Sequence, residues 1–125
     1  MEKSMALFLA TLLHSGTNTH FMHWATTSYA QHKTLGKFYE NIIELTDQLA
    51  EAYFGCYGQI KTFPDSYHLP KGTPLMYLES LQKFVKDARN DLPDESQLVQ
   101  LVDNIAQEID QTIYLLKFKG YYAIN

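Results

Sequence analysis

The sequence predicts an all-α protein that folds as a four-helix bundle. Four segments carry apolar residues at every third or fourth position, which is the spacing of one helix face. Segments rich in glycine, proline and short polar residues separate them, and no segment shows a convincing strand alternation. The length of 125 residues corresponds to one domain. A chain of this size buries roughly two thirds of its unfolded surface, so we expect a well-formed core.

The first two helices are expected at about residues 3–29 and 31–54. The residues with helical spacing in the first helix are Leu9, Leu13, either Gly16 or Thr17, His20 and Trp24. The weak helix formers at 15–19 favour a kink there. The most regular apolar stripe in the chain lies in the second helix and consists of Leu35, Phe38, Ile42, Leu45, Leu49 and Tyr53. Gly55 is the expected end of this helix, because glycine suits the left-handed conformation that closes many helices.

Residues 55–73 hold three glycines and two prolines, and we expect them to form a long crossover. The last two helices are expected at about residues 74–90 and 94–119. Asp94 and Glu95 would lie in the first turn of the fourth helix, where the helix dipole favours negative charge. The expected inward positions of these two helices are Leu75, Leu78, Leu81, Val85, Ala88, Leu98, Leu101, Ile105, Ile109, Thr112 and Leu116.

Composition and charge exclude several classes of protein. The net charge is −4 and the ten basic residues are scattered, which argues against a nucleic-acid-binding surface. The single cysteine cannot form an internal disulfide, so we expect a reducing, cytoplasmic setting. No apolar run is long enough to span a membrane. The apolar start at residues 5–13 lacks a following cleavage pattern, so we interpret it as helix rather than as a signal peptide.

The candidate functional residues lie between positions 20 and 51. His20 and His23 are one helical turn apart, His32 follows, and Asp47 and Glu51 share a face at i and i+4. Imidazole and carboxylate are ligands that suit iron, manganese and zinc. The alternative is structural, with the histidines as hydrogen-bonded polar residues between helices. The acids would then belong to a solvated stripe, which Glu40 and Glu44 extend.

Two motifs resemble the Dps family of ferritin-like proteins, which oxidise and store iron. Residues 20–24, HFMHW, resemble the H-x-x-H-W signature of the first Dps helix, and residues 47–51, DQLAE, resemble the D-x-x-A-E of the second. The resemblance covers residues 5–55 and, more loosely, 95–118, and it implies a ferritin-like four-helix bundle with a long crossover between helices two and three. The spacing from His23 to His32 is shorter than in the family, and the basic DNA-binding tail of some members has no counterpart.

The resemblance also implies a metal site between two subunits. His23 and His32 of one chain would bind iron, or another divalent metal, together with Asp47 and Glu51 of its twofold mate. His20, Trp24 and Glu44 would support these ligands from behind. The expected function is therefore that of an iron-binding mini-ferritin with ferroxidase activity, acting as a homodimer or larger homo-oligomer. The alternative is a non-catalytic helical scaffold or protein-interaction module with a degenerate metal site. Membrane and nucleic-acid partners are not expected.

Overall fold

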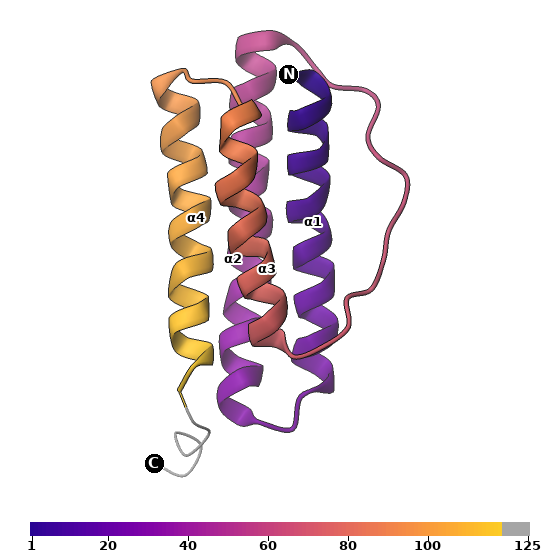
Figure 1. The fold of residues 1–125 in the computed structure, drawn as a ribbon, viewed down its shortest axis with the longest axis vertical. Coiled ribbons are helices and arrows are strands. Elements are labelled where there is room, and N and C mark those ends of the chain that lie inside the picture. Colours follow the sequence, from indigo (N-terminus) through magenta and orange to yellow (C-terminus); the bar gives the residue numbers. More distant parts are fainter. Residues whose placement is uncertain (119–125) are drawn as a thin grey trace.

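The computed structural model describes residues 1–118 and confirms the all-α prediction. The described residues contain four α-helices, one 3₁₀ turn and no strand (Figure 1). These elements are α1 (Glu2–Ala25), α2 (Tyr29–Tyr57), α3 (Pro74–Ala88), the 3₁₀ turn η1 (Arg89–Asp91) and α4 (Ser96–Leu116). Lys119 and Gly120, the expected end of the fourth helix, lie outside the described residues.

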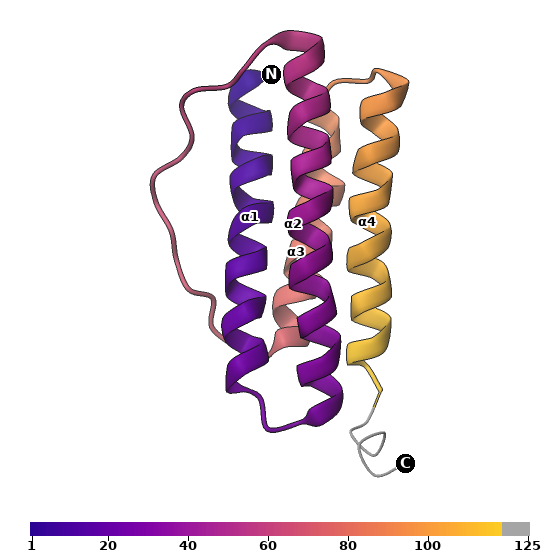
Figure 2. The same cartoon turned by 180° about the vertical axis from the view of Figure 1, so that it is seen from behind.

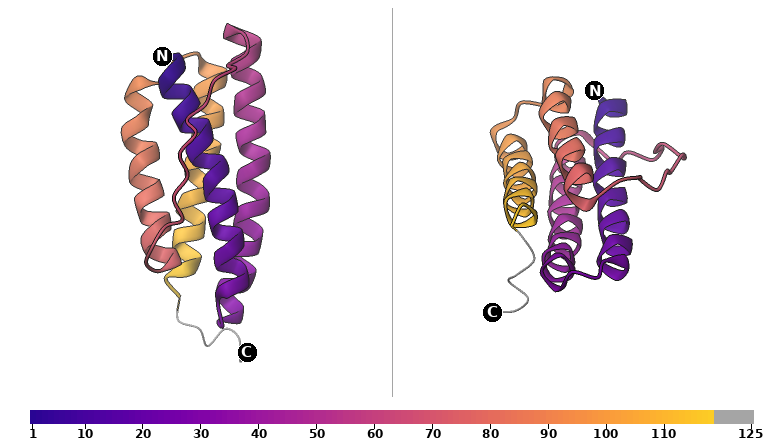
Figure 3. Two further views of the ribbon diagram at one scale, coloured as in Figure 1. Left: turned by 90° about the vertical axis from the view of Figure 1, so that its right-hand side faces the viewer. Right: turned by 60° about the horizontal axis from the view of Figure 1, so that its bottom comes forward.

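The four helices pack side by side with their axes roughly aligned, as Figures 1 and 2 show. α2 packs against both α1 and α4, and α3 packs against α4 and α1. The crossover at 58–73 has no helix or strand and runs over the outer side of α1 (Figure 3), which confirms the expected long crossover. The turn between α1 and α2 therefore lies at the same end of the bundle as the end of α4 (Figure 2).

The core is built from the apolar stripes predicted for α2, α3 and α4. Fully buried side chains from all four helices are Met5, Phe8, Leu12, Leu35, Phe38, Ile42, Leu49, Leu78, Ile105 and Ile109. The three stripes could be predicted because each of these helices has one apolar face and one charged face. No helix within residues 1–118 combines the length and the apolar character that a membrane span requires.

The face predicted for α1 was partly wrong. Leu13 is 43% exposed and Trp24 is 66% exposed, whereas Leu12, Ser15 and Thr19 are buried. Polar and apolar residues are mixed around the circumference of α1, so spacing alone does not identify the buried face. The helix is also continuous through residues 15–19. The buried hydroxyls there bond within the helix, that of Ser15 donating to the Leu12 carbonyl at 2.6 Å and that of Thr19 to the Ser15 carbonyl at 2.7 Å.

Several helix ends differ from the prediction. α1 ends at Ala25 and leaves a turn at 26–28, within which the Ser28 hydroxyl caps α2 by accepting from the Gln31 N–H at 3.2 Å. α2 continues through Gly55 and ends at Tyr57, and it is capped by Gly58, whose φ of +91° is a conformation that favours glycine.

Of the two C-terminal helices, α3 ends earlier than expected and α4 begins later than expected. α3 stops at Ala88 and gives way to the 3₁₀ turn η1. α4 begins only at Ser96, so Asp94 and Glu95 precede its first turn instead of lying within it. The connection between α3 and α4 is therefore longer than the sequence pattern predicted, because it includes residues assigned to the ends of both helices.

Candidate metal centre

The turn at 26–28 brings His23 of α1 against His32 of α2. The Nδ1 of His23 lies 2.6 Å from the backbone oxygen of His32, and the Nδ1 of His32 lies 2.9 Å from the backbone oxygen of His23. The two rings stack with centroids 3.8 Å apart and planes 16° from parallel. The shortened spacing between the two histidines therefore still places them together.

These reciprocal hydrogen bonds fix the tautomer of both rings. A carbonyl oxygen can only accept a hydrogen bond, so each Nδ1 carries the hydrogen and donates it. Each Nε2 then keeps its lone pair. Metal-binding histidines commonly donate their other ring N–H to a backbone carbonyl or carboxylate in this way, which holds the ring in place. The reciprocal hydrogen bonds therefore leave the Nε2 atom of each ring without a part in the contact between the two histidines.

The histidine pair lies in an open groove of about 470 Å³ at this end of the bundle. The groove is lined by His23, His32, Lys33, Thr34, Gly36, Lys37, Glu40 and Leu115. Gly36 matters most for the geometry, because a Cβ at this position would lie 2.9 Å from Cε1 of His23. The His23 ring thus packs directly on the α2 backbone, where a larger residue would displace it.

His20 and Trp24, expected to support the site, belong to an aromatic cluster beside the histidine pair. The His20 ring stacks on Tyr39 with centroids 3.9 Å apart and lies 4.6 Å from the Trp24 ring. The ring centroids of His20 and His23 are 6.2 Å apart, and the ring centroid of Tyr39 lies 5.4 Å from that of His23. Sequence reasoning missed Tyr39, although its position two helical turns after His32 places both on one face of α2.

The acidic candidates Asp47, Glu51 and Glu44 are exposed on α2 and lie far from the histidines of their own chain. Fifteen residues of helix separate His32 from Asp47, which corresponds to about 22 Å along the axis. Within residues 1–118, no three side chains of the metal-binding types His, Cys, Asp and Glu lie close enough together to hold a metal ion. A site with all four predicted ligands therefore requires acids from a second chain.

A separate polar cluster holds the crossover on α1. The buried amide of Asn18 donates to the Tyr77 hydroxyl at 3.0 Å and accepts from the Tyr67 hydroxyl at 2.5 Å. Burial raises the pKa of Tyr77, and its hydrogen bond to Asn18 acts in the opposite direction. The ring of His14 packs edge-on against Tyr67 with centroids 4.9 Å apart. His14 thus has a structural contact with the crossover.

Comparison with known proteins gives a relative and a family. A protein of Enterobacteria phage T4, described as an uncharacterized 14.6 kDa protein in the mobD-ri intergenic region, is 25% identical over 115 residues, which cover 90% of this chain and 87% of the phage protein. No solved structure matches the chain. The sequence profile of a family of unknown function, DUF5856, matches residues 23–116, a range that starts at the first histidine of the pair and includes both candidate acids. The match spans well over half of the chain, which therefore belongs to the DUF5856 family.

Proposed function

We propose that this protein is a ferritin-like, Dps-type iron-binding protein that oxidises Fe²⁺ between two subunits. The observation that carries the proposal is the reciprocal pair of hydrogen bonds between His23 and His32, which leaves both Nε2 atoms as ligands. The Dps-like motifs at 20–24 and 47–51 support the same reading.

The expected ligand set fits iron as the substrate. Imidazole nitrogen suits Fe²⁺, and the harder carboxylate oxygens of Asp47 and Glu51 favour Fe³⁺. Carboxylate ligation therefore lowers the free energy of the oxidised ion relative to the reduced one and makes oxidation easier. With peroxide as oxidant, two Fe²⁺ ions give up one electron each, and peroxide takes up two electrons and two protons to become water.

The aromatic cluster supports a redox role for the site. Tyr39 lies 5.4 Å from His23, and Trp24, which contacts His20, is exposed at the surface. Both side chains can donate an electron to an oxidising species that escapes from the iron, before that species damages other side chains irreversibly. Their role in the proposal is to protect the protein, and they are not metal ligands.

The test is an anaerobic titration with Fe²⁺ followed by addition of peroxide, with Fe³⁺ formation read by absorbance. His23→Ala/His32→Ala should abolish the fast phase of oxidation because it removes both nitrogen ligands. The matched control His14→Ala/His68→Ala removes two histidines outside the groove and should oxidise iron at the wild-type rate. Equal rates in wild type and in His23→Ala/His32→Ala would end the proposal.

A second candidate is a non-catalytic helical module that binds another protein. It is favoured by the lack, within residues 1–118, of three metal-binding side chains close to one another in a single chain. The two candidates differ in thermal melting with Fe²⁺, Mn²⁺ or Zn²⁺. A metal at 100 times its Kd stabilises the folded state by about 2.7 kcal/mol, which raises the melting temperature of a domain of this size by about 10 °C. A melting temperature unaffected by all three metals would favour the module.

A further inference from the structure

The groove that contains the histidine pair is also lined by three hydrogen-bond donors from α2. They are the ammonium groups of Lys33 and Lys37 and the hydroxyl of Thr34. The groove lies at the end of the bundle where α1 turns into α2 and where α4 ends (Figure 2). Its volume of about 470 Å³ leaves room for a small ion. The partners available to these three donors therefore indicate which ion suits the groove.

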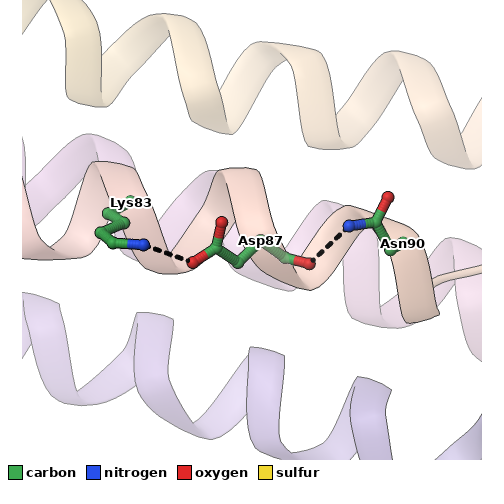
Figure 4. A network of polar contacts seen from close by, with 3 residues as sticks. All are labelled: Lys83, Asp87 and Asn90. Atoms are coloured by element: carbon green, nitrogen blue, oxygen red, sulfur yellow. Dashed lines mark hydrogen bonds and ion pairs between the residues drawn. The ribbon is translucent and has the colours of Figure 1, made fainter.

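The two groove lysines lack acidic partners. They lie one helical turn apart and both are exposed, so their charges repel each other along α2. Within residues 1–118 the ion pairs are those of Lys83 and Arg89, and neither groove lysine forms one. In α3, by contrast, Lys83 lies 3.0 Å from Asp87 one turn further on (Figure 4). The ammonium of Lys33 lies 5.9 Å from the centroid of the Tyr29 ring. An anion in the groove would relieve the repulsion between the two ammonium groups.

The hydroxyl of Thr34 has no partner within the described part of the chain. The other threonine of α2, Thr46, donates to the Ile42 carbonyl at 2.6 Å, a bond that threonines inside helices commonly form. One charge in the groove opposes an anion, because Glu40 lines it too. The groove thus holds two positive charges and one negative charge, so with neutral histidines its net charge is positive.

The histidine pair adds two acceptors to the same groove. Each Nδ1 donates to a backbone carbonyl, so the Nε2 atoms of His23 and His32 keep lone pairs that can accept a hydrogen bond. A fitting ligand therefore accepts from the lysines and Thr34 and also donates a hydrogen to a histidine. The hydrogenphosphate dianion does both, since three of its oxygens accept and the fourth carries a hydrogen. Sulfate has the same charge and shape but no hydrogen to donate.

We propose that the groove binds inorganic phosphate as the hydrogenphosphate ion. Lys33 and Lys37 hold its oxygens by charge, which is how lysine binds phosphate. Thr34 donates to a further oxygen, and the P–O–H group donates to the Nε2 of His23 or His32. The inference goes beyond the proposed function, because it needs neither a metal nor a second chain. The same Nε2 lone pairs would bind iron, so phosphate and iron are expected to compete for the groove.

The experiment is an NMR titration of the metal-free protein with sodium phosphate or sodium sulfate, at constant ionic strength and mildly alkaline pH. Both ions are dianions under these conditions, so a difference in affinity reports the donated hydrogen. Phosphate should shift the backbone amide signals of residues 32–37 until they saturate. Sulfate should bind about three- to tenfold more weakly, because one hydrogen bond to the protein is missing. Equal affinities, or the absence of a saturable shift with phosphate, would overturn the inference.

The charges are tested by substitutions at exposed positions. An exposed charged contact changes an equilibrium constant by a few-fold, so Lys33→Gln/Lys37→Gln should weaken phosphate binding about tenfold. The matched control Lys61→Gln/Lys71→Gln makes the same change in net charge on the crossover and should bind phosphate as wild type does. Glu40→Gln removes the opposing charge and should strengthen binding about two- to threefold. Wild-type affinity in Lys33→Gln/Lys37→Gln, or an equal loss in the crossover variant, would place the ion elsewhere and overturn the inference.

The role of the histidines is tested by His23→Ala/His32→Ala. With both rings removed, phosphate and sulfate should bind with about the same affinity, since the hydrogen of phosphate has lost its acceptor. A preference for phosphate that persists in this variant would overturn the inference. Methyl phosphate makes the same test on the wild type, so the result does not depend on the folding of the variant. Its dianion carries no hydrogen on oxygen and should bind as weakly as sulfate, whereas binding as tight as that of phosphate would also overturn the inference.

Discussion

Gly36 provides the sharpest test of the histidine pair, because its replacement by alanine separates metal binding from folding. A Cβ at this position would lie 2.9 Å from Cε1 and 3.1 Å from Nδ1 of His23. The first distance is closer than real Cβ atoms come and the second is tighter than most real contacts, so the imidazole must move away from α2. We expect this movement to weaken or break the Nδ1 hydrogen bond to the His32 carbonyl, which is 2.6 Å long.

The effect on stability should be small because two terms oppose each other. Alanine in place of glycine inside a helix stabilises by about 1 kcal/mol. Loss of one partly buried hydrogen bond costs about 1 kcal/mol, and the ring can move because it is only half-buried. We therefore expect a melting temperature within a few degrees of wild type. Metal affinity should fall by about 10- to 100-fold, the usual effect of removing the group that orients a histidine ligand.

The assay uses the fluorescence of Trp24, the single tryptophan, whose ring lies next to His20 in the aromatic cluster. Titration with Co²⁺, which quenches fluorescence and does not oxidise readily, gives the affinity. Gly55→Ala is the matched control, since this glycine lies in the same helix with no atom within 4 Å of a built Cβ. It should leave the affinity unchanged. Wild-type affinity in Gly36→Ala would refute the reasoning that the reciprocal hydrogen bonds prepare a metal site.

Asn18→Ala should destabilise the protein by about 1–3 kcal/mol, because it leaves the partly buried hydroxyl of Tyr77 without its partner. Thermal melting measures the loss, and faster proteolysis at 58–73 would show that the crossover has been released. The hydrogen bond to Glu95, followed by burial, raises the pKa of Tyr57 from 10.0 to about 12. The protonated phenol is the form stabilised by folding, so this contribution is full below pH 10 and is lost as pH rises through 12. Absorbance of tyrosinate should show one late-ionising group that Tyr57→Phe removes. Phe38→Ala should cost about 3–5 kcal/mol in unfolding free energy, because this side chain is fully buried; a loss below 1 kcal/mol in chemical denaturation would show that the core has been wrongly assigned.

The sequence predicted the buried faces of α2, α3 and α4 better than the buried face of α1. α2, α3 and α4 each have one apolar and one charged face, so the spacing of residues such as Ile42 and Ile105 identifies the buried side. α1 lacks this contrast, so its buried face depends on how its side chains pack against the neighbouring helices. Gly16 shows this, since a Cβ there would lie 2.9 Å from the Ile43 side chain, so α1 and α2 approach each other closely at this point.

Helix ends and the details of the site were less predictable for a related reason. Gly55 and Gly58 are equivalent as sequence signals, and only the cap from the Gly58 N–H to the Phe54 carbonyl, 2.8 Å long, decides between them. His23 and His32 could be chosen from their motif and chemistry. Their reciprocal hydrogen bonds depend on the backbone of the short turn at 26–28, which residue spacing does not specify.

The stiffness of α2 leads to a further prediction about concentration. His32 and Asp47 are held about 22 Å apart by one continuous helix, so no motion short of melting α2 can bring them together within a chain. If Asp47 and Glu51 are ligands, iron oxidation must come from associated chains, and the rate per chain should fall as the protein is diluted below the Kd of association. Activity and mass are measured on the same dilution series. A rate per chain that stays constant while the mass falls to that of one chain would exclude the acids as ligands, and the histidine pair would then have to bind iron with other partners.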